Sequence, residues 1–264
     1  MKKVISKDGT TIAFDQSGQG PALILVDGAL QYRAFDQGMA PLAGLLAKKF
    51  TVIHYDRRGR GDSTDTQPFA MEREIEDIKA LIDEAGGPAF LYGVSSGAAL
   101  AFEAALALGS KVRKLAIYEA PYNDDEAARQ AWKDYRRQLN KLVAAGRGGD
   151  AVGLFMMLVG ASAEDVEGMH QHPMWPLWEA VGHTLVYDAA ALGEEAAIPA
   201  RKAANLTVPT LVMDGGAGEW SFMHNTAIAL AKAIPNAQHC SLEGQTHEVA
   251  PEALAPVLIE FFNA

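Results

Sequence analysis

A serine lies between two glycines in the sequence GVSSG at residues 93–97. The pattern G-x-S-x-G is typical of a tight turn that lifts a serine hydroxyl clear of a sheet, where it can attack a carbonyl carbon. Glycines suit this turn because a β-carbon on either side would collide with neighbouring backbone. The apolar residues 89–92 predict a strand before the turn, and residues 98–105 predict a helix after it. Ser95 is therefore the candidate nucleophile.

A serine hydroxyl is a poor nucleophile until a neighbouring base takes its proton, so the chain must supply a histidine. Of the seven histidines, His247 is the best placed, because it follows the last predicted strand and precedes the final helix. Groups at the carboxyl ends of neighbouring parallel strands converge on one crevice. His54 lies inside a predicted strand, where a buried structural role is expected. We therefore expect His247 to act as the general base.

The elements that must position these residues follow a regular order. Predicted strands and helices alternate from residue 22 to residue 118 and again from residue 207 onward, which is typical of a parallel sheet with helices on both faces. Residues 123–204 show helical periodicity and no convincing strand, and insertions of this length are usually functional. The sequence thus predicts an α/β core at residues 1–122 and 205–264, interrupted by a helical insertion at residues 123–204.

Composition excludes several kinds of partner. Among the 264 residues, 33 are acidic and 23 are basic, which gives a formal net charge of −10. This charge argues against nucleic acid and against an anionic membrane surface, because both require a basic face. The basic start of the chain is followed by no apolar run, so we expect no signal peptide and a cytoplasmic location.

Cysteines and metal-ligand spacings also limit the chemistry. Cys240 is the only cysteine, so neither an internal disulfide nor a cysteine metal cluster is expected. The spacing of the histidines and carboxylates matches no metal motif, because the chain has no His-Glu-x-x-His sequence. We therefore expect neither a metal nor a cofactor in the reaction.

Four motifs occur in an order that resembles the α/β-hydrolase superfamily over essentially the whole chain. They are LVDGA at 25–29, YDRRGRGDS at 55–63, GVSSG at 93–97 and GQTH at 244–247. The resemblance implies an α/β-hydrolase fold, with a mostly parallel eight-stranded sheet, helices on both faces and a helical cap where the insertion lies. It also implies a triad of serine, histidine and a carboxylate.

The carboxylate that should orient the histidine is not at the superfamily's usual position. That aspartate follows the seventh strand, and here the position falls on Gly218. Asp214 comes too early and Glu219 one place late, and both stay alternatives. Zearalenone-lactonase-like members resemble this chain in the Glu-x-Pro sequence that begins at Glu119, and in an Asp-Gly opening of the oxyanion loop. The resemblance therefore implies Glu119 as the acid.

An oxyanion hole needs two backbone N–H donors, one of them from the residue after the nucleophile. By that rule Ser96 supplies one donor, and the resemblance implies Ala29 for the other. The insertion is rich in aromatic residues and methionines, which indicates an apolar pocket for a small hydrophobic ligand. The residues that we expect to line this pocket are Leu30, Trp175, Trp178 and Trp220.

These residues predict a serine hydrolase that cleaves a small apolar carboxylic ester or lactone through an acyl-enzyme. Hydrolysis of a C–C bond and cofactor-free perhydrolysis stay open, because fold and triad do not distinguish among these reactions. The alternative from another class is a non-catalytic ligand-binding protein on a hydrolase scaffold, which the glycine at position 218 favours. We expect a small apolar substrate as the partner, and we expect neither nucleic acid nor a membrane. A homo-oligomer is compatible with the sequence.

Overall fold

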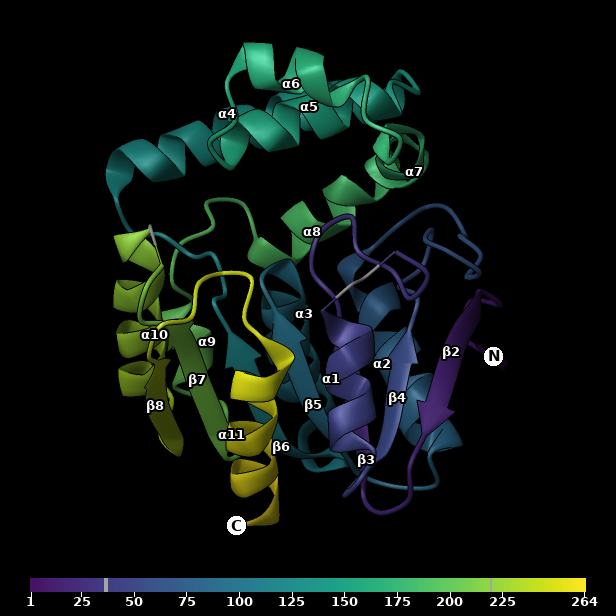
Figure 1. The fold of residues 1–264 in the computed structure, drawn as a ribbon, viewed down its shortest axis with the longest axis vertical. Coiled ribbons are helices and arrows are strands. Elements are labelled where there is room, and N and C mark those ends of the chain that lie inside the picture. The colour runs from purple at the N-terminus through teal and green to yellow at the C-terminus, as the bar shows by residue number, and fades with distance from the viewer. Residues whose placement is uncertain (36–37, 219) are drawn as a thin grey trace.

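The computed structural model describes residues 1–35, 38–218 and 220–264, and these residues are built on one eight-stranded sheet (Figure 1). Apolar runs such as Ala22–Val26 form the central strands, because both sides of these strands are buried. The strands are β1 (Lys2–Ile5), β2 (Thr11–Ser17), β3 (Ala22–Val26), β4 (Thr51–Tyr55), β5 (Ala89–Val94), β6 (Val112–Tyr118), β7 (Thr210–Gly215) and β8 (Ala237–Leu242).

The strands lie in the order β1-β2-β4-β3-β5-β6-β7-β8. β2 runs antiparallel to both of its neighbours, whereas the strands from β4 to β8 are parallel to one another. The prediction of a mostly parallel eight-stranded sheet is therefore confirmed. The parallel strands bring their carboxyl ends to one edge of the sheet, and this edge carries the predicted nucleophile, acid and base.

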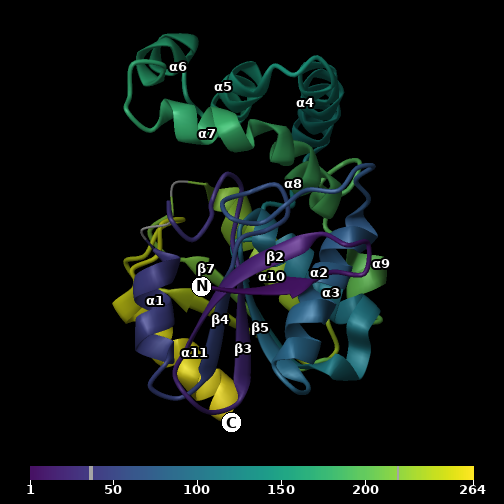
Figure 2. The same ribbon diagram turned by 90° about the vertical axis from the view of Figure 1, so that its right-hand side faces the viewer.

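Helices cover both faces of the sheet, also as predicted (Figure 2). Alternate residues of each central strand serve opposite faces, so Leu23 and Leu25 pack in one cluster while Ile24 and Val26 pack in another. The first cluster includes α1 (Met39–Leu46) and α11 (Pro251–Asn263). The second includes α2 (Met71–Glu84), α3 (Ser96–Leu108) and α10 (Ser221–Ala233).

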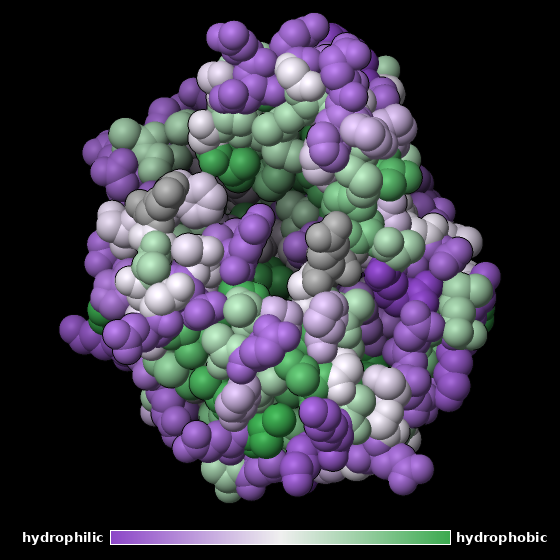
Figure 3. All heavy atoms as spheres, in the orientation of Figure 1, coloured by the Kyte–Doolittle hydropathy of each residue, from purple (hydrophilic) through white to green (hydrophobic). Residues whose placement is uncertain are grey.

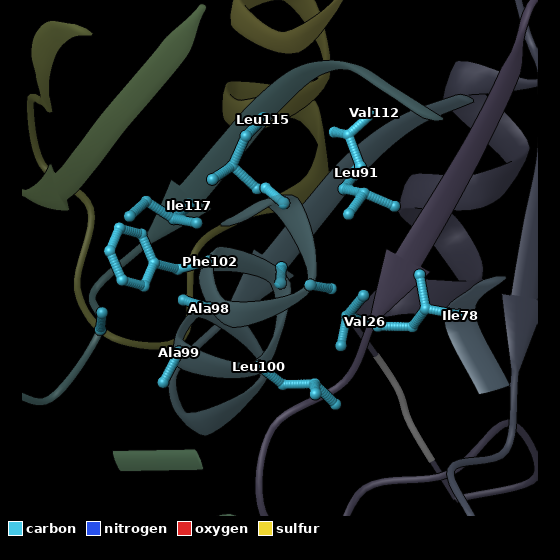
Figure 4. Packing of buried hydrophobic residues seen from close by; sticks show 14 of the residues in the cluster. Val26, Ile78, Leu91, Ala98, Ala99, Leu100, Phe102, Val112, Leu115 and Ile117 are labelled. Atoms are coloured by element: carbon cyan, nitrogen blue, oxygen red, sulfur yellow. The ribbon is translucent and has the colours of Figure 1, made fainter. Parts of the chain in front are cut away.

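The helix that follows the predicted nucleophile is part of the central core. Figure 4 shows Phe102 and the small residues Ala98 and Ala99 of α3 beside Leu115 and Ile117 of β6. Small side chains let this helix approach the sheet closely, and Phe102 fills the space beside them. The amino terminus of α3 is consequently held firmly against the ends of the strands.

Residues 123–204, all of which are described, contain helices and no strand. Four of the helices form a layer above the carboxyl ends of the strands, and α8 lies between this layer and the sheet (Figures 1 and 2). We call α4 to α8 the insertion helices. Their bounds, with α9, are α4 (Glu126–Ala144), α5 (Gly148–Leu158), α6 (Ala163–Met169), α7 (Trp175–Val181), α8 (Leu185–Leu192) and α9 (Ala200–Ala203).

Two segments form elements that differ in extent from their sequence patterns. The apolar run at residues 207–213 forms a strand that begins at Thr210, after Pro209, which has no N–H to donate to a strand ladder. The helical pattern at residues 35–48 contains α1, at Met39–Leu46, while residues 36 and 37 lie outside the described residues. Over the described ranges, no helix has both the length and the apolar character needed to cross a bilayer.

Candidate active site

Ser95 occupies the turn between β5 and α3 with a left-handed backbone conformation, φ 55° and ψ −128°. Its N–H donates to the Tyr118 carbonyl at 3.0 Å, which ties the turn to the end of β6. The flanking glycines are required by space: a Cβ on Gly93 would lie 2.4 Å from the Gly97 carbonyl oxygen. A Cβ on Gly97 would lie 2.3 Å from the carbonyl oxygen of Val26. The turn therefore holds Ser95 at the carboxyl edge of the sheet.

The close approach of Gly97 makes a testable prediction. We expect Gly97→Ala to lower the free energy of unfolding by about 2 kcal/mol or more, because the added methyl forces β3 and α3 apart. Gly44→Ala is the matched control, since Gly44 lies within α1 and its Cβ would meet nothing within 4 Å. That control should be neutral or gain up to about 1 kcal/mol in urea unfolding. Equal effects of the two substitutions would contradict the packing argument.

Glu119 and His247 lie in direct contact. Glu119 directly follows β6, is 3% exposed, and has a left-handed φ of 47° that turns its side chain along the carboxyl edge. Its Oε2 lies 2.6 Å from His247 Nδ1, and its Oε1 accepts a hydrogen bond of 2.9 Å from the Gly215 N–H. Both carboxylate oxygens are thus engaged, which fixes the carboxylate. With Nδ1 facing Glu119, His247 has Nε2 left for a reacting partner.

The loop that carries His247 is held from the same strand end. The Tyr118 hydroxyl donates to the carbonyl of Thr246, the residue before the histidine. The His247 side chain keeps about a third of its surface exposed, at 30%, and the Trp220 ring lies edge-on to it with centroids 5.7 Å apart. The imidazole is therefore oriented from one side and accessible from the other.

Of the two alternative acids, the structure describes Asp214 but not Glu219. Asp214 contacts other histidines, with Oδ2 2.8 Å from His224 Nδ1 and Oδ1 2.6 Å from His239 Nε2. Glu219 lies outside the described residues. At Gly218, a Cβ would lie 3.5 Å from Glu119 Oε1, in ordinary van der Waals contact, so the superfamily's usual acid position lies directly beside the Glu119 carboxylate.

The expected oxyanion donors lie beside the nucleophile. Ser96 is the first residue of α3, and the first N–H groups of a helix have no partner within the helix. Ala29 and Ser96 both line the same pocket as Ser95. A Cβ on Gly28 would lie 3.2 Å from the Ser95 Cβ, so the loop after β3 passes directly next to the nucleophile.

Two buried arginines hold the loop that contains Ala29. Arg60 Nη1 donates to the Gly28 carbonyl at 2.6 Å and to the Gln31 carbonyl at 3.2 Å. Arg57 Nη1 donates to the Asp27 carbonyl at 3.2 Å. These bonds point the carbonyls of the loop toward the arginines and fix the orientation of its peptide groups.

Asp188 of α8 joins the insertion helices to this arginine pair. Its Oδ1 lies 2.6 Å from Arg57 Nη1 and accepts a 2.8 Å hydrogen bond from the Ser96 hydroxyl, while Oδ2 lies 2.7 Å from Arg60 Nη2. Burial alone would raise the pKa of Asp188, but the charges of Arg60 and Arg57 and the Ser96 hydrogen bond outweigh it and hold the pKa below its usual range. The carboxylate is thus a buried anion that contacts Ser96 directly and the loop containing Ala29 through Arg57 and Arg60.

Sequence reasoning missed this role of Asp188, because the residue lies in the helical insertion without a motif around it. The arginines themselves belong to the segment at residues 55–63, one of the four motifs of the resemblance. The charge pattern points to a missing partner: Arg57 and Arg60 need more carboxylates than helix α2 supplies. Glu74 of α2 binds only Arg57, so Arg60 must find its carboxylate elsewhere in the chain.

A pocket of about 1100 Å³ lies between the insertion helices and the carboxyl ends of the strands. Ser95 and His247 line its floor, and most of the remaining wall is apolar. Figure 3 shows the hollow on this side of the molecule, with hydrophobic residues around it beneath the upper helices. Apolar wall residues from the insertion include Trp132, Phe155, Leu158, Met174, Trp178 and Leu185.

The four residues expected to line the pocket divide into two pairs. Trp178 and Trp220 lie in the wall. Leu30 and Trp175, both described, do not contribute to it, and instead they are 3% and 7% exposed in a hydrophobic cluster of the insertion helices. Leu30 has a left-handed φ of 62°, and its side chain packs in the same cluster as Tyr135.

Unfavourable backbone conformations concentrate around the pocket. Among the described residues, the non-glycine residues with positive φ are Leu30, Ser95, Glu119 and Ala196. Ser95 and Ala196 line the pocket. Leu30 directly follows a residue of the pocket wall, and Glu119 contacts the candidate base. Such conformations cost about 1–3 kcal/mol each and persist where the surrounding structure enforces them, most often at functional sites.

Comparison with known proteins agrees with this architecture. Residues 18–253 match the alpha/beta hydrolase family. The chain is 52% identical to an alpha/beta hydrolase from Sphaerobacter thermophilus DSM 20745, over 99% of this chain and 100% of that one, with a TM-score of 0.86.

More distant structures share the fold alone. A thermophilic esterase from Thermogutta terrifontis is 22% identical over 99% of this chain and 97% of its own, with a TM-score of 0.74. The enol-lactonase from Burkholderia xenovorans LB400 is 19% identical over 100% of both chains, with a TM-score of 0.71.

A match among curated proteins is partial. The Mycobacterium tuberculosis protein named "Probable oxidoreductase EphD" is 35% identical over 86 residues. The matched segment covers 31% of this chain and 14% of the length of that relative. The family match and the Sphaerobacter structure, by contrast, extend over nearly the whole chain. The chain belongs to the alpha/beta hydrolase family.

Proposed function

We propose that the chain is a serine hydrolase that cleaves small apolar carboxylic esters or lactones through an acyl-enzyme. Ser95 is the nucleophile, His247 the general base and acid, and Glu119 the carboxylate that orients His247. The observation that carries the proposal is the 2.6 Å contact of Glu119 Oε2 with His247 Nδ1, at the edge of a pocket that Ser95 also lines.

The proposed reaction has two halves. Ser95 Oγ attacks the carbonyl carbon as its proton passes to His247 Nε2, and the N–H groups of Ser96 and Ala29 stabilise the oxyanion. His247 then gives the proton to the leaving alcohol, and the ester bond breaks. A water next transfers its proton to His247 and attacks the acyl carbon, which releases the acid and restores Ser95. Glu119 stays ionised and stabilises the imidazolium in both halves.

The pocket wall supports the proposed substrate class. A pocket of about 1100 Å³ is large enough for a small ligand, and its apolar wall offers hydrophobic contacts with few charged partners. The esterase and the enol-lactonase with the same fold make both ester and lactone suitable substrates to test. The likeness to zearalenone-lactonase-like members stays a prediction.

Hydrolysis of p-nitrophenyl acetate, butyrate and octanoate tests the proposal. We expect turnover by the wild type and loss of at least about 10,000-fold in kcat for Ser95→Ala, because the nucleophile is gone. Ser110→Ala, at an exposed serine, is the matched control and should keep full activity. Equal rates for wild type and Ser95→Ala would contradict the proposal.

Further assays on the same protein distinguish the alternatives. A wild-type protein that turns over neither esters nor lactones but binds apolar ligands would favour the ligand-binding protein on a hydrolase scaffold. Formation of a peracid from acetate and hydrogen peroxide would favour perhydrolysis, and cleavage of a ketone's carbon–carbon bond would favour C–C hydrolysis. The engagement of His247 by Glu119 supports catalysis over the binding role, since a degraded triad does not require that contact.

A further inference from the structure

A second cluster of titratable side chains lies away from the pocket, on the last three elements before the His247 loop. Asp214 lies on β7, His224 on α10 and His239 on β8. Asp214 is fully buried, whereas the His224 and His239 side chains are 49% and 28% exposed. None of the three lines the pocket of Ser95 among the described wall residues. The cluster therefore presents a buried carboxylate beneath two accessible imidazoles.

The three side chains converge because of the register of the sheet. Asp214 pairs with Ser241 across β7 and β8, and His239 lies two residues before Ser241, so both β8 side chains point to the same face. α10 packs on that face and brings His224 to it. One ligand atom from each of Asp214, His224 and His239 lies within 4.8 Å of the other two.

We propose that Asp214, His224 and His239 form a binding site for one divalent transition-metal ion, with Zn²⁺ the best chemical match. Two imidazole nitrogens and one carboxylate oxygen are a donor set that zinc accepts, with a water completing the tetrahedron. A divalent ion would also place a positive charge beside the buried Asp214 carboxylate.

The observed distances are close to those of a metal site. Zn–N bonds of about 2.0–2.1 Å and Zn–O bonds of about 2.0–2.2 Å in a tetrahedron separate the ligand atoms by about 3.3 Å. His224 Nδ1 and His239 Nε2 now lie 2.8 Å and 2.6 Å from the Asp214 oxygens. The two distances must widen by about 0.5 and 0.7 Å to reach that separation. They reach different oxygens of Asp214, so the two nitrogens must also shift toward one shared ion, and rotation of the exposed His224 and His239 rings can supply both movements.

The surroundings of Asp214 suit a ligating carboxylate. The Ser241 hydroxyl donates to its Oδ2 at 2.9 Å, as expected for an outer partner that orients a ligand.

The sequence showed no metal motif because these ligands lie 10 and 15 residues apart on three separate elements. Only the packing of α10 against the β7–β8 pair brings them together. The proposed site is therefore separate from the residues Ser95, Glu119 and His247.

Titration of the EDTA-treated and dialysed full chain with Zn²⁺ tests the proposal by calorimetry, with Co²⁺ as a spectroscopic substitute. We expect one ion per chain, and d–d absorption from Co²⁺ that indicates tetrahedral coordination. His224→Ala and His239→Ala should each weaken Zn²⁺ binding by about tenfold or more. His170→Ala replaces an exposed histidine at the end of α6. It is the matched control and should leave the affinity unchanged.

The readout does not depend on enzyme activity, so it is separate from the test of the proposed function. His224 is half-exposed, and its replacement should leave the fold intact, which far-ultraviolet circular dichroism checks. Absence of saturable binding to the folded wild type would overturn the proposal. Unchanged affinity in both histidine variants would also overturn it and would leave the cluster as a hydrogen-bonded Asp–His–His group.

Discussion

Glu119→Gln is expected to lower kcat for ester hydrolysis by about 1,000- to 10,000-fold. The amide can still meet His247 Nδ1, but it carries no charge to stabilise the imidazolium. Its NH₂ group also competes with the Nδ1–H for the same space and can select the wrong tautomer of the ring. Because glutamine has nearly the same size and shape as glutamate, the substitution should leave the position of the loop almost unchanged. Steady-state kinetics with the p-nitrophenyl esters measures the effect.

Two further variants show whether the loss of activity is specific to Glu119. Glu243→Gln removes an exposed carboxylate from the loop before His247 and should keep activity within about twofold, because surface charges interact weakly with the site. Glu219→Gln tests the remaining alternative acid. Near-wild-type activity in Glu119→Gln together with a large loss in Glu219→Gln would transfer the acid role to Glu219.

Asp188→Asn is expected to lower the free energy of unfolding by about 3–5 kcal/mol, because it leaves Arg60 buried without a carboxylate partner among the described residues. It should also reduce kcat, since Ser96 and the arginines that hold the Asp27–Gly28 carbonyls lose their shared anchor. Urea unfolding at pH 7 and ester kinetics measure the two effects. Asp83→Asn, at an exposed carboxylate paired with Lys79 and Lys111, is the control and should cost less than about 1 kcal/mol.

The dependence of this effect on pH has a defined sign. The pKa of Asp188 is lower in the folded chain than in the unfolded chain, where it is about 3.9. The stabilisation by its charge is therefore complete above about pH 3.9 and is lost as the pH falls through the folded value. The stability difference between wild type and Asp188→Asn should stay constant from pH 7 to about pH 5 and shrink below pH 4. A difference that shrinks already near pH 6 would contradict this assignment.

Local sequence patterns predicted the parts of the molecule whose causes are local. The strand–turn–helix around Ser95 could be predicted because its apolar strand, its two glycines and its helix-forming residues follow one another directly in the sequence. The alternation of buried strands and amphipathic helices predicted the sheet for the same reason. The contact of Gly97 with the Val26 carbonyl, by contrast, became visible only in the structure. Glu119 was assigned by resemblance, and the structure brings it to His247 across 128 residues of sequence.

Features that depend on packing between distant segments could not be predicted. Composition indicated an aromatic insertion, but it could not say that Trp178 faces the pocket while Trp175 packs inside the insertion helices. Asp188 contacts Arg60 across 128 residues, and its helix gives no local sign of that contact. The Asp214 cluster likewise depends on the register between β7 and β8.

The most direct test of the central claim is covalent labelling with a fluorophosphonate, followed by intact-mass measurement and peptide mapping. The account predicts one adduct per chain on Ser95, formed more slowly in His247→Ala and in Glu119→Gln, because both variants weaken removal of the serine proton. An adduct on another residue, or no adduct on a folded wild-type chain, would contradict Ser95 as the nucleophile of an acyl-enzyme mechanism.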